Sequence, residues 1–300
     1  MGKSISNQIV GVCRFSYAGF GGFSASQQEV WELEAMLYDP TRMRQRFFFF
    51  ENICLPSLAA QTDQDFTLVA LIADTMPFKW RRRLKNLMEP YPFLRICTLE
   101  AAGPLNSTRR AYKRGWDRKS EFMTGFRIDD DDAVAIDYIA KTREVADHFL
   151  DIGWADHENP AVIAFHRGLY WDMVNDAAAF HEFSEIGPLG LASAMVTPVE
   201  TQSNMYRWNH RKVAAHVRSW MDPSDMMFIR TLHGHNDSDR SIPPGALAIP
   251  DQQARTLMRE RFGLEPVKLI NLMRRLRDDP LSIEEDDGPD DGPPEPVVED

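Results

Sequence analysis

Four consecutive aspartates, Asp129 to Asp132, are the residues of this chain whose spacing most clearly suggests chemistry. Adjacent carboxylates repel by about 1 kcal/mol per pair in water and roughly 4 kcal/mol at an effective dielectric near 20, so a folded domain rarely holds four together without a cation. On a strand, alternation would pair Asp129 with Asp131 and Asp130 with Asp132. Two carboxylates on one face can share an ion, and oxygen ligands favour Mg²⁺, Mn²⁺ or Ca²⁺ over zinc. We predict a metal site, and a solvated acidic turn is the alternative.

The elements that must position these aspartates alternate between strand-like and helix-like patterns. Strands are predicted at about residues 8–17, 66–73, 94–99 and 122–128, and helices at 41–61, 78–88 and 107–116, the first kinked or split at Pro56. This alternation predicts an α/β fold with a mostly parallel sheet flanked by helices. Ligands of such sheets bind at the carboxyl ends of the strands. The aspartates and a glycine-rich loop at 17–23 both fall at that edge.

The second half of the chain has a looser pattern. It predicts a helix at 138–149, strands at 161–165 and 168–172, and two terminal helices at 250–262 and 266–277. The last helix has an apolar face and a basic end, so it either packs on the domain, which we expect, or rests on an anionic membrane surface. We predict a domain at 1–249, packed helices at 250–278, and a disordered acidic tail at 279–300.

Charge and cysteine content narrow the class of protein. The 300-residue chain has a net charge of −11, yet residues 278–300 hold eleven Asp or Glu and no Lys or Arg, so the remainder is balanced. A balanced body argues against nucleic acid as a partner. Cys13, Cys54 and Cys97 form no metal or disulfide pattern and indicate reduced core residues. With no leader-like or membrane-spanning stretch, we expect a cytoplasmic protein, with peripheral contact at the inner membrane face left open.

Several segments in order resemble a known group of enzymes. Residues 58–69, LAAQTDQDFTLV, are similar to a helix-to-strand signature of nucleotide-sugar glycosyltransferases of the GT-A type, and residues 127–133, RIDDDDA, resemble their DxD motif. Arg14-Phe15-Ser16, Gly21-Gly22-Phe23, Leu37-Tyr38-Asp39-Pro40 and the segment 233–238, HGHNDS, look more narrowly like the bacterial "putative rhamnosyl transferase" family. The resemblance covers residues 8–245 and implies a GT-A-like fold.

The resemblance also implies roles for individual residues. In GT-A enzymes a divalent ion, Mn²⁺ or Mg²⁺, bridges the DxD carboxylates and the diphosphate of the sugar nucleotide and assists the leaving group. Carried over, Asp131 is the direct metal ligand, Asp129 contacts metal-bound water or the donor ribose, and Asp132 orients the sugar or supports the ligands. His233 takes the place of a late histidine that contacts the metal or phosphate. The alternative for His233 is a turn-capping histidine.

Two arginines and one more carboxylate complete the candidate site. Arg14 and Arg127 either hold the donor diphosphate or form structural ion pairs within the acidic cluster. If transfer inverts the anomeric centre, a carboxylate must remove the acceptor's proton. The resemblance points to Asp222-Pro223-Ser224-Asp225, and we take Asp225 as the catalytic base although the usual Glu-Asp pair is missing. Asp222 also fits a helix cap before Pro223.

Together these patterns predict a metal-dependent glycosyltransferase. It would move a sugar, rhamnose if the family description holds, from a nucleoside-diphosphate donor to a glycan or lipid-linked acceptor. The alternatives are a catalytically inactive nucleotide- or partner-binding scaffold of the same fold and another metal-dependent nucleotide-processing enzyme. The last of these usually carries a phosphate-binding GxxxxGK[ST] loop, which this sequence lacks.

Overall fold

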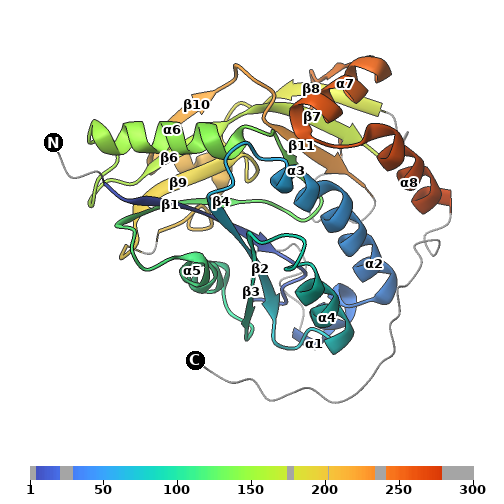
Figure 1. Cartoon of the computed structure of the whole chain (residues 1–300), viewed down its shortest axis with the longest axis horizontal. Coiled ribbons are helices and arrows are strands. Elements are labelled where there is room, and N and C mark those ends of the chain that lie inside the picture. The colour runs from blue at the N-terminus through green and yellow to red at the C-terminus, as the bar shows by residue number, and fades with distance from the viewer. Residues whose placement is uncertain (1–4, 21–29, 174–178, 202, 234–240, 279–300) are drawn as a thin grey trace.

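The computed structural model describes residues 5–20, 30–173, 179–201, 203–233 and 241–278, and its centre is a seven-stranded sheet (Figure 1). The strand order is β10-β6-β9-β4-β1-β2-β3. The bounds are β1 (Asn7–Arg14), β2 (Phe66–Ala73), β3 (Leu94–Leu99), β4 (Phe122–Arg127), β6 (Ala161–Phe165), β9 (Ser193–Pro198) and β10 (Arg218–Asp222). Neighbouring strands run parallel except that β9 is antiparallel to both β4 and β6. The predicted α/β class with a mostly parallel sheet is confirmed.

Helices cover both faces of this sheet, as its continuous apolar strands require. The first half contains α1 (Val30–Leu37), α2 (Pro40–Phe49), the short π-helix η1 (Phe50–Cys54), α3 (Leu55–Ala59), α4 (Phe78–Asn86), α5 (Pro104–Gly115) and α6 (Tyr138–Asp151). Alternate residues of β1 enter different cores: Ile9 and Cys13 pack with residues of α2 and α6, whereas Val10 and Val12 pack with residues of α1 and α5. Figure 1 shows α5 on the opposite side of the sheet from α2 and α6.

The helix predicted at 41–61 is present but irregular. Asp39 caps α2 by accepting a hydrogen bond from the backbone N–H of Arg42, and Pro40 occupies the first turn. The π-helix η1 then separates α2 from α3, and Pro56 lies in the first turn of α3, where its missing N–H costs least. The segment therefore stays helical from Pro40 to Ala59, and its irregular part is the π-helix η1 rather than a break at Pro56.

A second, five-stranded sheet was not predicted. Its order is β12-β8-β7-β11-β5, with β5 (Ala133–Val134), β7 (Arg167–Asp172), β8 (Ala179–Ser184), β11 (Phe228–Leu232) and β12 (Leu247–Ala248). The 3₁₀-helix η2 (His210–Ala215) precedes β10, and α7 (Asp251–Phe262) and α8 (Pro266–Asp278) follow the sheet. Met258, Phe262 and Ile270 of these two helices are buried in the main core. The acidic tail at 279–300 lies outside the described residues.

Candidate functional site

The four aspartates lie in a turn directly after the central strand β4, next to the end of β1. The backbone N–H of Asp132 donates to the carbonyl oxygen of Asp129 at 3.2 Å, which closes the turn. The predicted strand-like pairing of alternate aspartates is therefore wrong, because the chain leaves the sheet at Arg127. Asp130, Asp131 and Asp132 are buried, with exposed fractions of 0, 4 and 6%, while the Asp129 side chain is 48% exposed.

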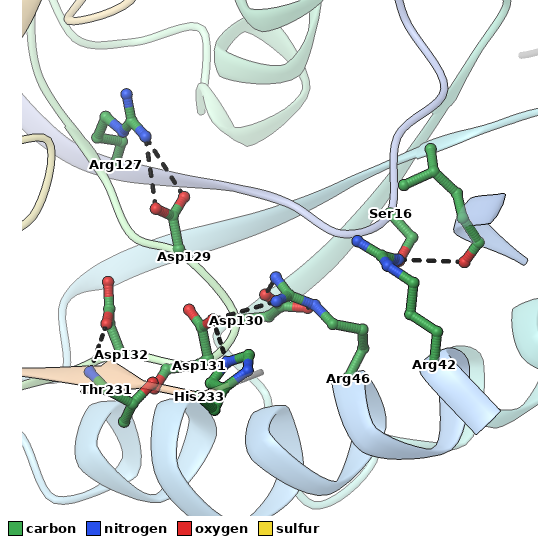
Figure 2. A network of polar contacts seen from close by, with 11 residues as sticks. Ser16, Arg42, Arg46, Arg127, Asp129, Asp130, Asp131, Asp132, Thr231 and His233 are labelled. Carbon is green, nitrogen blue, oxygen red and sulfur yellow. Dashed lines mark hydrogen bonds and ion pairs between the residues drawn. The ribbon is translucent and has the colours of Figure 1, made fainter. Parts of the chain in front are cut away.

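Arg46 of α2 neutralises the buried part of the turn (Figure 2). Its guanidinium pairs with both oxygens of Asp130, with Nε 2.6 Å from Oδ2, and its Nη1 lies 3.1 Å from Oδ2 of Asp131. Sequence analysis missed this residue. A usable signal was present, because Arg42 and Arg46 are four residues apart and so share a helix face beside the apolar Met43 and Phe47. The cation predicted from charge repulsion is thus supplied at least in part by an arginine.

Arg42 supports the neighbouring strand end from one turn earlier on the same helix. Its Nη1 donates to the hydroxyl of Ser16 and to the carbonyl oxygen of Leu37, each at 3.1 Å. Ser16 follows β1 and has a φ of 47°, in the left-handed region. Helix α2 therefore anchors the loops that leave β1 and β4, as Figure 2 shows.

His233 contacts Asp131, as the sequence predicted it would approach the acidic cluster. Its Nε2 lies 2.8 Å from Oδ2 of Asp131, and its ring stacks on Phe49 with centroids 4.3 Å apart. Burial alone would raise the pKa of Asp131, but the charge of Arg46 and the hydrogen bond from His233 hold it well below its usual range. Asp131 is therefore an ionised carboxylate with two cationic or donor neighbours. His235, the other histidine of this motif, lies outside the described residues.

Asp132 has the opposite electrostatic character. Its Oδ1 accepts from the backbone N–H of Thr231 at 3.2 Å, and the Thr231 hydroxyl donates to the carbonyl oxygen of Asp131 at 2.8 Å. Burial, together with the charges of Asp131 and Asp129, raises the pKa of Asp132 well above its ordinary value, and Arg230 only partly offsets this. The turn therefore holds one carboxyl group, that of Asp131, whose ionised form is stabilised, and one, that of Asp132, whose ionised form is destabilised.

Arg127 and Arg14 flank the exposed side of the turn. Arg127 Nη2 lies 3.4 and 3.5 Å from the two oxygens of Asp129. The guanidinium carbons of Arg127 and Arg14 lie 4.7 and 6.0 Å from the centroid of the Tyr206 ring, a residue that the sequence did not single out. A Cβ at Gly190 would come within 2.8 Å of the Arg127 guanidinium carbon, so a larger residue there would displace the Arg127 guanidinium. The predicted pairing of Arg127 with the acidic cluster is present.

The fit of this site to a divalent ion rests on Asp131 and His233. Oδ2 of Asp131 and Nε2 of His233 lie 2.8 Å apart, so the two side chains would hold one divalent ion between them if it replaced the proton that they now share. Asp129 turns toward Arg127, and no cluster of three His, Cys, Asp or Glu side chains arranged for a metal occurs in the described part of the chain. Two protein ligands suit Mg²⁺ or Mn²⁺, which complete their coordination with water and phosphate oxygens.

Asp225 is not brought to the acidic turn. It lies before β11, whereas His233 follows that strand, and the five residues of β11 rise about 3.3 Å each. Its carboxylate pairs with Lys141 of α6, and this hydrogen bond is the main cause of its lowered pKa. Asp222 instead accepts from the backbone N–H of Ser224 at 2.7 Å. The role of Asp225 as catalytic base stays a prediction, and its position does not favour it.

A second polar group extends from the turn along the other sheet and was also missed by sequence analysis. The buried Glu185 contacts the hydroxyl of Tyr170 and pairs with Arg211 Nη1 at 2.9 Å. Arg230 lies 5.8 Å from the centroid of the Tyr170 ring and close enough to Asp132 for their charges to interact. A largely buried network of polar side chains therefore continues from Asp132 through Arg230 and Tyr170 to Glu185.

Comparisons with known proteins give one family. Residues 8–245 match the model of a family described as "Putative rhamnosyl transferase". The comparison with curated proteins found no match. The chain also matches structures of S. aureus TarS 1-349: the first has 12% identity and a TM-score of 0.39, and the match covers 76% of this chain and 60% of the TarS chain. The complex with UDP-GlcNAc has 13% identity and a TM-score of 0.40, with 90% and 67% covered.

Proposed function

Because the chain belongs to the "putative rhamnosyl transferase" family, a group of glycosyltransferases, we propose that it is a metal-dependent enzyme that uses a nucleoside-diphosphate sugar. It transfers the sugar, rhamnose by the family description, to a glycan or lipid-linked acceptor. The observation that carries this proposal is the contact of 2.8 Å between Asp131 and His233 at the carboxyl end of the central strand. In parallel sheets this edge is where ligands bind.

In this proposal the residues in and beside the turn have different roles. Asp131 and His233 hold Mn²⁺ or Mg²⁺, which when bound neutralises charge on the departing nucleoside diphosphate. Arg127 and Arg14 contact the diphosphate, and Arg127 exchanges its present partner, Asp129, for phosphate oxygens. Asp129 then contacts the donor ribose or metal-bound water, and Asp132, beside Arg230, orients the sugar. The acceptor loses its hydroxyl proton to a base for which Asp225 remains the candidate.

One observation favours a variant of this proposal without metal. Arg46 Nη1 lies 3.1 Å from the same Asp131 oxygen that a metal would use. An arginine already neutralises Asp131, so the chain could bind a nucleotide without an ion and serve as a catalytically inactive scaffold. Chelation separates the two candidates, because EDTA abolishes nucleotide binding only if the ion is part of the site.

Replacement of Asp131 by asparagine tests the proposal directly. We expect Asp131→Asn to abolish the Mn²⁺-dependent rise in melting temperature on addition of one nucleotide from a panel of UDP, GDP and dTDP, and to lower transfer at least about 100-fold. A ligand bound only by the folded state raises the melting temperature, so thermal shift reports binding directly.

Asp117→Asn is the matched control, since Asp117 is an exposed carboxylate in the turn before β4, at the opposite end of that strand from the acidic turn. It should respond to the nucleotide and Mn²⁺ as the parent does. The proposal fails if Asp131→Asn binds the same nucleotide with the same metal dependence as the parent, or if no nucleotide of the panel shifts the parent with either ion.

A further inference from the structure

The positive charge of this chain is concentrated in one stretch. Residues 79–119 contain twelve Lys or Arg and three Asp or Glu, a net charge of +9, whereas the whole chain has −11. Charge on this scale attracts a partner of opposite sign over a Debye length, about 10 Å at 0.1 M salt. The acidic turn and its arginines do not account for it, because none of them lies in this stretch.

Part of this charge forms a single surface, which we call the α5 basic face and define as Arg95, Arg110, Lys113 and Arg114. All four side chains are exposed. The three on α5 recur at the spacing of one helix face, opposite the buried residues Ser107, Thr108, Ala111, Tyr112 and Gly115. None of the four pairs with an acidic side chain among the described residues, so the charge of this face is uncompensated.

The sheet places Arg95 on the same side as α5. Arg95 and Cys97 of the edge strand β3 are two residues apart and therefore point to the same face, and Cys97 packs with Ala111 of α5 in one core. The charges of Arg110 and Arg114 also act on the Cys97 thiol, opposing the effect of burial on its pKa. The four cations therefore lie on the same side of the sheet, on α5 and on its neighbour β3, the edge strand of the sheet.

An exposed aromatic side chain lies near the N-terminal end of α5, the helix that carries three of these cations. Phe20 is 57% exposed, and its backbone N–H donates to the carbonyl oxygen of Ala102 at 3.1 Å, two residues before α5 begins at Pro104. The hydroxyl of Tyr17 holds the same connection by donating to the carbonyl oxygen of Glu100 at 2.7 Å. An apolar ring at the end of a row of cations matches the headgroup and acyl boundary of a lipid layer better than it matches a soluble polyanion.

We propose that the α5 basic face binds an anionic lipid surface, with Phe20 inserted at the headgroup level. The inference does not rest on the proposed catalytic function. None of the helices in the described ranges has the length and apolar character needed to cross a bilayer. Binding to acidic lipids through a few cations and one aromatic anchor is reversible and depends on salt.

Vesicle partitioning of the full chain tests this proposal. We expect sedimentation with vesicles of 30% phosphatidylglycerol in phosphatidylcholine at 0.05 M NaCl, but not with pure phosphatidylcholine or at 0.5 M NaCl. The triple variant Arg110→Gln, Lys113→Gln, Arg114→Gln should partition roughly 100-fold more weakly, because each basic residue near an acidic surface contributes about fivefold. Phe20→Ser should reduce partitioning roughly fivefold.

The matched control removes an equal number of positive charges from a different helix, α4. Arg81→Gln, Arg82→Gln, Lys85→Gln changes three cations of α4 and should partition within about twofold of the parent. The proposal is overturned if both triple variants lose binding equally, or if Phe20→Ser has no effect while soluble polyphosphate displaces the protein from vesicles, which indicates a soluble polyanion. The proposal is also overturned if the protein binds no vesicle. If, in addition, the hydrodynamic radius of the parent rises with salt while that of the α5 triple variant does not, the acidic tail occupies the α5 basic face.

Discussion

At the scale of single residues, the acidic turn is held together by ion pairs of unequal kind. Asp130 has no exposed surface and is bound by Arg46, so two charges are buried together. Removing one partner of such a pair leaves an uncompensated buried charge, whereas removing both is often tolerated. Asp131 shares the same arginine, so any change at Arg46 also reaches the candidate metal ligand.

Replacement of Arg46 should therefore destabilise the fold. We expect Arg46→Met to lower the free energy of unfolding by about 3–5 kcal/mol in urea titrations at pH 7, because Asp130 is left buried and ionised. The double variant Arg46→Met, Asp130→Asn should recover at least half of this loss. If the double variant is as unstable as the sum of the two single variants, the pair is not the source of the effect.

Removal of the Asp132 charge should instead stabilise the fold at neutral pH. Burial and its acidic neighbours raise its pKa, so the folded state binds its proton more tightly than the unfolded state, and the stability tied to that proton is lost as pH rises above about 3.9. With metal chelated, Asp132→Asn should melt about 2–4 °C higher than the parent at pH 7, and the difference should shrink toward pH 4. A lower melting temperature at pH 7 would show that another charge fully compensates Asp132.

At the scale of elements, β11 determines the position of the candidate metal ligand. Its residues Thr231 and Leu232 lead directly into His233, and the strand is fixed by parallel pairing with β7, where Phe228 lies opposite Gly168. A Cβ at Gly168 would meet Phe228 ring atoms at 2.4–2.6 Å. The Phe228 ring thus packs directly on the backbone of β7 at Gly168, and a larger residue there would have to displace the ring.

Gly168→Ala is expected to strain this pairing. Overpacking of a buried contact typically costs about 1–3 kcal/mol, which should appear as a lower urea midpoint with an unchanged slope. Gly187→Ala is the control, because the nearest atom to its added Cβ, the carbonyl oxygen of Arg211, is 3.6 Å away. Equal stability of the two variants would show that β7 moves away from β11 without cost.

At the scale of the whole molecule, all three cysteines are buried in the hydrophobic cores on the two faces of the main sheet. Cys13, Cys54 and Cys97 are free and buried, and burial raises the pKa of each thiol. In the native protein at pH 8 we expect fewer than one thiol per chain to react with a disulfide reagent within minutes, and all three to react in 8 M urea. Rapid reaction of Cys13 or Cys54 in native buffer would contradict the burial of the core beneath the candidate site.

Sequence patterns by themselves determined six strands (β1, β2, β3, β4, β6 and β7), most helices and the place of the acidic turn at the sheet edge, but not the remaining strands of either sheet. These features depend on local alternation, as β3 at Leu94–Leu99 and α8 from Pro266 illustrate. Only the tertiary structure showed that Arg46 meets Asp130 across 84 residues, that the turn departs from strand geometry, and that Asp225 faces Lys141. The reason is physical: which cation approaches a buried carboxylate depends on how helices pack over the sheet, and no spacing within one segment encodes that contact.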